Sequence, residues 1–98
     1  MVYKQTNEQT LGEVIEQLMD SYRIKNRFYE QRLIAKYPEI VGPMISRYTE
    51  GLQIRNRVLF LKIASPLVRN ELSYARSSLT ESLNKAVGKD VIDKIVLK

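Results

Sequence analysis

Hydrophobic residues recur at helical spacing close to the N-terminus. Thr10-Leu11-Gly12-Glu13 has the pattern of a capping box, in which the threonine hydroxyl and the glutamate carboxylate each satisfy a free backbone N–H. Behind it, apolar residues return every three or four positions, while the acidic residues fall on the opposite face. The apolar set is Leu11, Val14, Ile15, Leu18, Met19 and Tyr22. The pattern predicts an amphipathic helix of about three turns.

The stretch that follows contains signals for a connector and for helix breaks. Residues 23–27, Arg-Ile-Lys-Asn-Arg, are predicted to form a basic connector. A second helical pattern runs from Leu33 to Tyr48, but Pro38 and Gly42-Pro43 interrupt it. A proline inside a helix removes a hydrogen bond and clashes with the preceding turn. We therefore predict a short helix that ends near Lys36, and a second piece with Pro38 in its first turn.

Residues 51–64 alternate in the way that is typical of a β-hairpin. If Asn56-Arg57 forms the two-residue turn, one face of the hairpin is entirely apolar, and a slip of one residue would mix the two faces. The apolar face then consists of Leu52, Ile54, Leu59, Leu61 and Ile63. The opposite face consists of Gln53, Arg55, Val58, Phe60 and Lys62. Glycine would be expected where Arg57 stands, so the turn is imperfect.

A long helix and a last strand complete the pattern. Ser65-Pro66 predicts a helix start, and the helix is predicted to run to Gly88. Residues 94–98 alternate, with Lys94, Val96 and Lys98 on one side, and predict a strand. A right-handed crossover would lay the long helix across the apolar hairpin face. The predicted class is α+β, in the order α-α-β-β-α-β, with helices on one face of a three-stranded sheet.

Length and composition indicate one globular domain. Of the 98 residues, 44% are hydrophobic and 28% are charged, which is ordinary for a folded protein. We expect residues 1–9 to be a flexible N-terminal segment and residues 10–98 to be a single domain. The chain has no cysteine, which excludes disulfides and fits a reducing compartment. With no signal-peptide pattern and no apolar run of ~20 residues, a soluble cytoplasmic protein is expected.

Charge is unevenly distributed along the chain. The formal net charge is +5, but residues 1–22 have four acids against one lysine, whereas residues 23–62 have nine cations against three acids. A concentrated positive region attracts polyanions over roughly a Debye length, ~8 Å at physiological salt. The alternative is a solvated basic surface that only keeps the protein soluble.

The residue types argue against catalysis. There is no histidine, which removes the commonest general base and the commonest metal ligand. The carboxylates are scattered, and the four glycines do not form a phosphate-binding loop. We therefore expect a protein that is not an enzyme and that uses no metal and no cofactor.

The polar face of the hairpin is the main candidate for binding. Basic groups contact phosphates, and an aromatic ring can stack on an unpaired base for ~1–3 kcal/mol. The candidate phosphate contacts are Arg23, Lys25, Arg27, Arg55, Arg57, Lys62, Arg69 and Arg76. Alternatively, Phe60, Val58 and Gln53 form a protein interface, covered by the N-terminal segment or by a second subunit.

Three short motifs carry a family resemblance. They are Tyr37-Pro38-Glu39-Ile40-Val41-Gly42-Pro43, then Ser65-Pro66-Leu67-Val68-Arg69-Asn70-Glu71-Leu72, and the ending Leu83-Asn84, Val87-Gly88, Val91 and Ile95. Together they resemble the bacterial DciA family over residues 10–98. The family usually has Trp where this chain has Tyr37, and commonly a second Trp where it has Val68. Both substitutes can fill a core position, but an interaction through an exposed indole is not expected here.

The resemblance implies a KH-like domain and a role in DNA replication. Members of the family help to bring the hexameric replicative helicase onto DNA, so the implied partners are the helicase and single-stranded or forked DNA. The chain lacks the GxxG loop of true KH domains, and we do not expect the basic, flexible extension that some members carry. Two alternatives stay open: a KH-like RNA-binding module, and an interaction module that associates with a protein or with a second copy through its sheet face.

Overall fold

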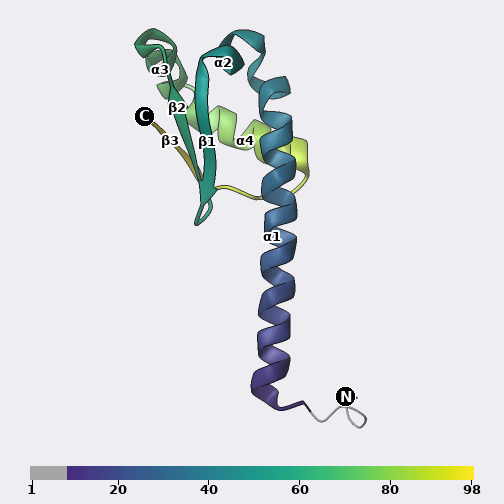
Figure 1. Ribbon diagram of the computed structural model, residues 1–98. Coiled ribbons are helices and arrows are strands. Elements are labelled where there is room, and N and C mark those ends of the chain that lie inside the picture. Colours follow the sequence, from purple (N-terminus) through teal and green to yellow (C-terminus); the bar gives the residue numbers. More distant parts are fainter. Residues whose placement is uncertain (1–8) are drawn as a thin grey trace.

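Seven helices and strands follow one another along residues 9–98, the part of the chain that the computed structural model describes (Figure 1). They are α1 (Leu11–Val41), α2 (Pro43–Tyr48), β1 (Thr49–Arg55), β2 (Val58–Ile63), α3 (Pro66–Ser73), α4 (Arg76–Val87) and β3 (Lys94–Leu97). The predicted α+β class, with helices on one face of a three-stranded sheet, is confirmed. Except for Gln9, the segment predicted to be flexible lies outside the described residues.

Helix α1 is a single helix of 31 residues. Its predicted capping box is confirmed: the Thr10 N–H donates to the Glu13 carboxylate at 2.7 Å, and the Glu13 N–H donates to the Thr10 hydroxyl at 3.1 Å. The predicted connector at residues 23–27 and the predicted helix end near Lys36 are wrong. Arginine and lysine are good helix formers, and residues 23–27 contain no glycine or proline, so basic composition alone does not interrupt the helix.

The helix break occurs at Gly42-Pro43 and not at Pro38. Pro38 lies inside the last turn of α1, where its missing N–H removes only one hydrogen bond. Gly42 has φ 91°, a left-handed conformation that glycine adopts without steric cost, and its N–H donates to the Pro38 carbonyl at 2.9 Å. Pro43 then fits the first position of α2. The predicted helix start at Pro38 is therefore wrong.

The hairpin has the predicted register. Arg55 pairs with Val58, Ile54 with Leu59 and Leu52 with Leu61. Asn56 and Arg57 both have positive φ, 49° and 64°, as a type I′ turn requires. Strand β3 then pairs with β2 in parallel, which gives the strand order β1-β2-β3.

The helix predicted from Ser65 to Gly88 is instead two helices. Its start is confirmed, because the Ser65 hydroxyl accepts a hydrogen bond from the Val68 N–H. At the break, the N–H groups of Tyr74 and Ala75 donate to carbonyls three residues earlier and so tighten the turn. This bend lets α3 pack on β2 while α4 packs on α1 and β3. The apolar spacing continues through the bend, and no glycine or proline marks it.

The core lies between the sheet and the helices. Its largest fully buried side chains are Tyr37, Leu33, Leu59, Leu61, Leu83 and Ile92. The second half of α1 supplies the first two of these. The first half of α1 extends away from the sheet and from the other helices (Figure 1). We call residues 11–22 the projecting segment and residues 29–41 the packed segment.

Candidate nucleic-acid interface

The face of the sheet that the helices do not cover is open. On β2 and β3 the buried residues Leu59, Leu61, Ile63 and Ile95 point toward the helices, so the alternate residues point outward. Aligned by the strand register, the outward residues are Gly51, Gln53, Arg55, Val58, Phe60, Lys62, Lys94, Val96 and Lys98. We call this set the open sheet face. Its centre contains Phe60 and Val96, its ends carry Arg55, Lys62, Lys94 and Lys98, and the set contains no acidic side chain.

Phe60 is half-buried at the centre of the open sheet face, and two cations approach its ring. The guanidinium carbon of Arg55 lies 5.0 Å from the ring centroid, and the Lys98 Nζ lies 5.4 Å from it. Such exposed cation–π contacts contribute about 0.5–1 kcal/mol each, whereas stacking of a base on an aromatic ring contributes about 1–3 kcal/mol. A base can therefore displace a cation from the ring, and the released cation is then placed to contact a phosphate.

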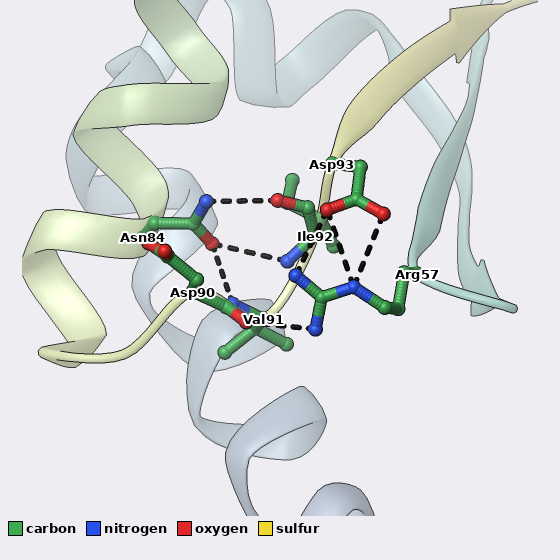
Figure 2. Close-up of polar contacts among 6 residues, drawn as sticks. All are labelled: Arg57, Asn84, Asp90, Val91, Ile92 and Asp93. Carbon is green, nitrogen blue, oxygen red and sulfur yellow. Dashed lines mark hydrogen bonds and ion pairs between the residues drawn. The ribbon is translucent and has the colours of Figure 1, made fainter.

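Arg57, at the hairpin turn, is engaged within the fold. Its guanidinium donates to the Asp93 carboxylate at 2.8–3.2 Å and to the Asp90 carbonyl at 2.9 Å (Figure 2). These hydrogen bonds hold the pKa of Asp93 below its usual value. Arg57 thus ties the turn to the segment before β3, and as a phosphate contact it would have to give up these bonds.

Asn84 fixes the same segment from the side of α4. Its side-chain oxygen accepts hydrogen bonds from the N–H groups of Val91 and Ile92 at 2.9 and 3.1 Å, and its nitrogen donates to the Ile92 carbonyl at 2.8 Å (Figure 2). One side chain therefore satisfies three backbone groups of a segment that has no strand partner there. These hydrogen bonds position the start of β3, including Lys94.

Arg69 and Arg76 lie beside the sheet and not on its open face. The Arg69 guanidinium donates to the Ile63 carbonyl at 3.0 Å, and the Arg76 Nε donates to the Ser73 carbonyl at 3.3 Å. The two side chains line a shallow hollow of about 400 Å³ together with Leu97. They extend the positive surface past the β3 edge, but part of their hydrogen-bonding capacity is already used.

The remaining predicted cations are on α1. Arg23, Lys25 and Arg27 are exposed, and Arg23 forms an ion pair with Asp20 at 2.7 Å. Of the eight predicted phosphate contacts, the structure therefore brings Arg55 and Lys62 together on the open sheet face and places the others on other parts of the fold.

A comparison with protein families shows to which family the chain belongs. The model of the family described as Dna[CI] antecedent, DciA, matches residues 10–97. The chain belongs to the DciA family. This family is associated with loading of the replicative helicase, so a replicative helicase is the implied partner. No curated protein and no solved structure gives a significant match, and the KH-like character stays a prediction.

The two positions at which this DciA chain lacks the family's tryptophans are in the core. Tyr37 is 1% exposed and Val68 is 8% exposed. The Tyr37 hydroxyl forms a hydrogen bond with the Thr49 hydroxyl at 2.9 Å, and the Thr49 hydroxyl donates to the Ile45 carbonyl at 2.8 Å. Burial raises the pKa of Tyr37. Neither position offers a ring to a partner, so these substitutions concern packing.

The three residues predicted as a protein interface, Phe60, Val58 and Gln53, all lie on the open sheet face, and within residues 9–98 no helix covers them. Lys94 and Lys98 are two further cations of this face, and neither was predicted to be a phosphate contact. The alternation of residues 94–98 did place them on one side of a strand. The predicted crossover implied a parallel strand, but neither its partner β2 nor the register that sets these lysines beside Phe60 and Lys62 was predicted.

The helices and the acidic side chains of residues 9–98 bear on two further kinds of site. Within that range no helix has both the length and the apolar character needed to cross a membrane. Nor does that range hold three or more carboxylate, histidine or cysteine groups placed to bind a metal ion.

Proposed function

We propose that this DciA-family chain is a non-enzymatic accessory protein of DNA replication that helps to load the hexameric replicative helicase and that binds single-stranded DNA on the open sheet face. The family match supports the helicase part of the proposal. The arrangement of cations around Phe60, with no carboxylate among them, supports the DNA part.

The dimensions of the open sheet face suit a short stretch of single strand. Three strands spaced about 4.8 Å apart, with about 3.3 Å per residue along each, give a platform roughly 10 Å wide and 13 Å long between the corner cations. Sheets of similar size in RNA-recognition domains stack two or three bases. We therefore expect a site of two or three nucleotides, with one base on Phe60 and phosphates near Lys62, Lys94 and Lys98.

The same chemistry favours single strands over duplex and tolerates most sequences. A paired base in a duplex cannot offer its face to Phe60, whereas every unpaired base can. Lysine contacts to phosphates carry no sequence information. A helicase loader that acts at opened DNA of any sequence needs this kind of recognition.

The test is a titration of the full chain against a fluorescent single-stranded oligonucleotide at several salt concentrations. Phe60→Ala should weaken binding by about 5- to 150-fold, which is the stacking energy expressed as an affinity ratio. Lys62→Ala and Lys98→Ala should each weaken binding and lower the log–log salt slope by about 1. Lys85→Ala is the matched control, because Lys85 is exposed on α4, away from the open sheet face.

Several outcomes would count against the DNA part of the proposal. Absence of binding at low salt, or an equal loss for Lys85→Ala, would contradict a site on the sheet. A clear preference for one RNA sequence would support the RNA-binding alternative instead. A pull-down with the replicative helicase, with and without single-stranded DNA, tests the helicase part. Loss of helicase capture in Phe60→Ala, together with no DNA binding, would make the face a protein interface.

A further inference from the structure

Strand β3 forms an edge of the sheet, on the side away from α1 (Figure 1). The Lys98 N–H donates to the Leu61 carbonyl at 2.8 Å, and the Lys98 carbonyl accepts from the Ile63 N–H at 3.0 Å. Backbone groups of successive residues point to opposite sides of a strand, so those of Ile95 and Leu97 point away from β2. In the part of the chain that the structure describes, no other strand lies on that side. The edge therefore presents the N–H groups and carbonyls of Ile95 and Leu97 to a further strand.

Two shallow hollows, of about 490 and 400 Å³, lie along this edge and are lined by residues of β3 and of the neighbouring helices α3 and α4. Lys94 and Ile95 line the first hollow, and Leu97 lines the second. The Arg76 side chain lines both, so the two hollows adjoin. We call them together the β3 groove. It gives a further strand room beside β3 from Lys94 to Leu97.

The opposite edge of the sheet is less suited to a further strand. Strand β1 pairs with β2 through a register shift between Thr49 and Gly51. A bulge of this kind twists an edge strand and disfavours further pairing. Strand β3 pairs with β2 without such a shift. Of the two edges, β3 is therefore the one that offers a regular row of hydrogen-bonding groups.

The side chains that line the β3 groove are mainly cationic where they are charged. The cations are Arg69, Arg76 and Lys94. The acids are Glu81 and Asp93, and Asp93 is already paired with Arg57 at 2.8 Å. Complementary charge steers a partner to a surface and suppresses wrong partners. An occupant with negative charge therefore matches this groove.

A second copy of β3 does not match the edge. The antiparallel register that pairs Ile95 with Leu97 across two copies has the greatest overlap, and it sets Lys94 beside Lys98. Like charges directly opposite each other destabilise a strand pair. Lysines on an edge strand are one means by which proteins avoid edge-to-edge association. The partner strand must therefore differ from β3 in charge.

A phosphate backbone does not match the edge either. Ionised phosphate groups accept hydrogen bonds, so they cannot satisfy the outward carbonyls of Ile95 and Leu97. An extended peptide offers donors and acceptors in alternation, which satisfies both the N–H groups and the carbonyls of an edge strand. The hydrogen-bonding pattern of the edge therefore favours a peptide over nucleic acid.

We propose that the β3 groove binds an extended acidic segment of a partner protein, which pairs with β3 and adds a fourth strand to the three-stranded sheet. In this mode of recognition, main-chain hydrogen bonds hold the segment and alternate side chains give specificity. One set of side chains lies beside Lys94 and Lys98, and the other set enters the groove near Arg76. The contact goes beyond the proposed function and does not depend on DNA binding, because β3 separates the added strand from Phe60 on β2.

The test is a titration of the full chain with a fluorescent peptide of about seven residues, in which glutamate and valine alternate and which spans roughly 23 Å when extended. The wild type should bind this peptide. Arg76→Glu and Lys94→Glu should each weaken binding by about tenfold or more, because each sets like charges across the contact. Lys85→Glu is the matched control, because Lys85 is exposed on α4 and does not line the β3 groove.

A second peptide separates strand pairing from attraction between charges. It has the same side chains but is methylated on every amide nitrogen, so it keeps its charge and cannot donate main-chain hydrogen bonds. It should bind more weakly by about tenfold or more. Equal binding of the two peptides would overturn the inference, and so would an equal loss in Lys85→Glu.

Amide hydrogen exchange locates the contact on the chain. With the unmethylated peptide bound, exchange at Ile95 and Leu97 should slow by about tenfold or more. The Lys98 amide is already bonded to Leu61 and should change less. Protection at β1 in place of β3 would overturn the inference. Protection of Ile95 and Leu97 by a single-stranded oligonucleotide, and not by the peptide, would also overturn it and make the edge a nucleic-acid site.

Phe60→Ala distinguishes this inference from the proposed function. The variant should bind the peptide like the wild type, although its binding of a single-stranded oligonucleotide should weaken. Loss of peptide binding in Phe60→Ala would place the peptide on the open sheet face and overturn the inference. If the wild type binds the oligonucleotide but not the peptide, the inference alone fails. If it binds the peptide at β3 but no oligonucleotide, the inference holds and the DNA part of the proposed function fails.

Discussion

The two halves of α1 have the same hydrophobic pattern and opposite surroundings. In the packed segment, Leu33 is 0% exposed and Tyr37 is 1% exposed, whereas in the projecting segment Leu11 is 76% exposed and Leu18 is 64% exposed. Periodicity therefore identifies which face of a helix is apolar, but not whether that face is covered. The sheet and α4 cover one half, whereas the apolar side chains of the other half are exposed within the described residues.

The largest expected effect comes from truncating one leucine in each half. Leu33→Ala removes a fully buried side chain from the core, and it should lower the free energy of unfolding by about 2–5 kcal/mol. Leu18→Ala, on the exposed stripe, should change it by less than about 0.5 kcal/mol. Denaturant unfolding of dilute, monomeric protein measures both. Equal losses for the two variants would show that the projecting segment is covered within its own chain.

A smaller effect on the free energy of unfolding is expected at Tyr37, where the packed segment contacts the start of β1. Tyr37→Phe removes the hydrogen bond to Thr49 and should cost about 0.5–1.5 kcal/mol. Burial raises the pKa of Tyr37 above its ordinary value of 10.0, so the stability linked to its protonated form is present below that pH and is lost as pH rises beyond it. In Tyr37→Phe, the free energy of unfolding should therefore decrease less at alkaline pH than it does in the wild type. Tyr74→Phe, at a tyrosine that is 81% exposed, is the control.

A variant of the capping box should affect the projecting segment alone. Thr10→Ala removes one half of the box and should destabilise the first turns of α1 by about 0.5–2 kcal/mol. Because the first turns of α1 extend away from the sheet and the other helices (Figure 1), amide exchange should accelerate at residues 11–22 and stay unchanged at residues 29–41. Faster exchange throughout α1 would contradict the separation of the two halves.

The smallest effect concerns the ion pair near the junction of the two halves. The hydrogen bonds from Arg57 lower the pKa of Asp93, so their contribution is present above the carboxylate's ordinary pKa of 3.8 and is lost as pH falls through the lower folded value. Asp93→Asn should lower the melting temperature slightly at neutral pH. The variant's melting temperature should also decrease less than that of the wild type when the pH is lowered. Asp90→Asn, which keeps the carbonyl that Arg57 contacts and leaves Asp93 in place, is the control.

Local patterns predicted much of the fold. The capping box at Thr10, the hairpin register with Asn56-Arg57 as the turn, and the helix start at Ser65 each depend on residues close in sequence, and each is confirmed. The turn forms without glycine because Arg57, held at φ 64°, gains hydrogen bonds to Asp93 and Asp90. This compensation spans 36 residues and could not be read from the turn itself.

The wrong predictions all concern how elements begin, end or meet. A cluster of cations at residues 23–27 looked like a connector, although nothing in it disfavours a helix. The bend at Tyr74 and Ala75 follows from packing against two different surfaces and leaves no mark in the sequence. Lys94 and Lys98 join the candidate site only through the parallel pairing of β3 with β2. The DNA contacts themselves stay a prediction.

The parallel pairing of β3 with β2 also bears on the order of folding. The hairpin closes over two residues, a local event that takes about 1–10 μs in isolated hairpins, whereas β3 can join β2 only after α3 and α4 have carried the chain back across the sheet. Asn84 and Arg57 then lock the arriving strand from opposite sides. The last strand to arrive brings Lys94 and Lys98, so a chain that has not finished folding presents an incomplete cationic surface.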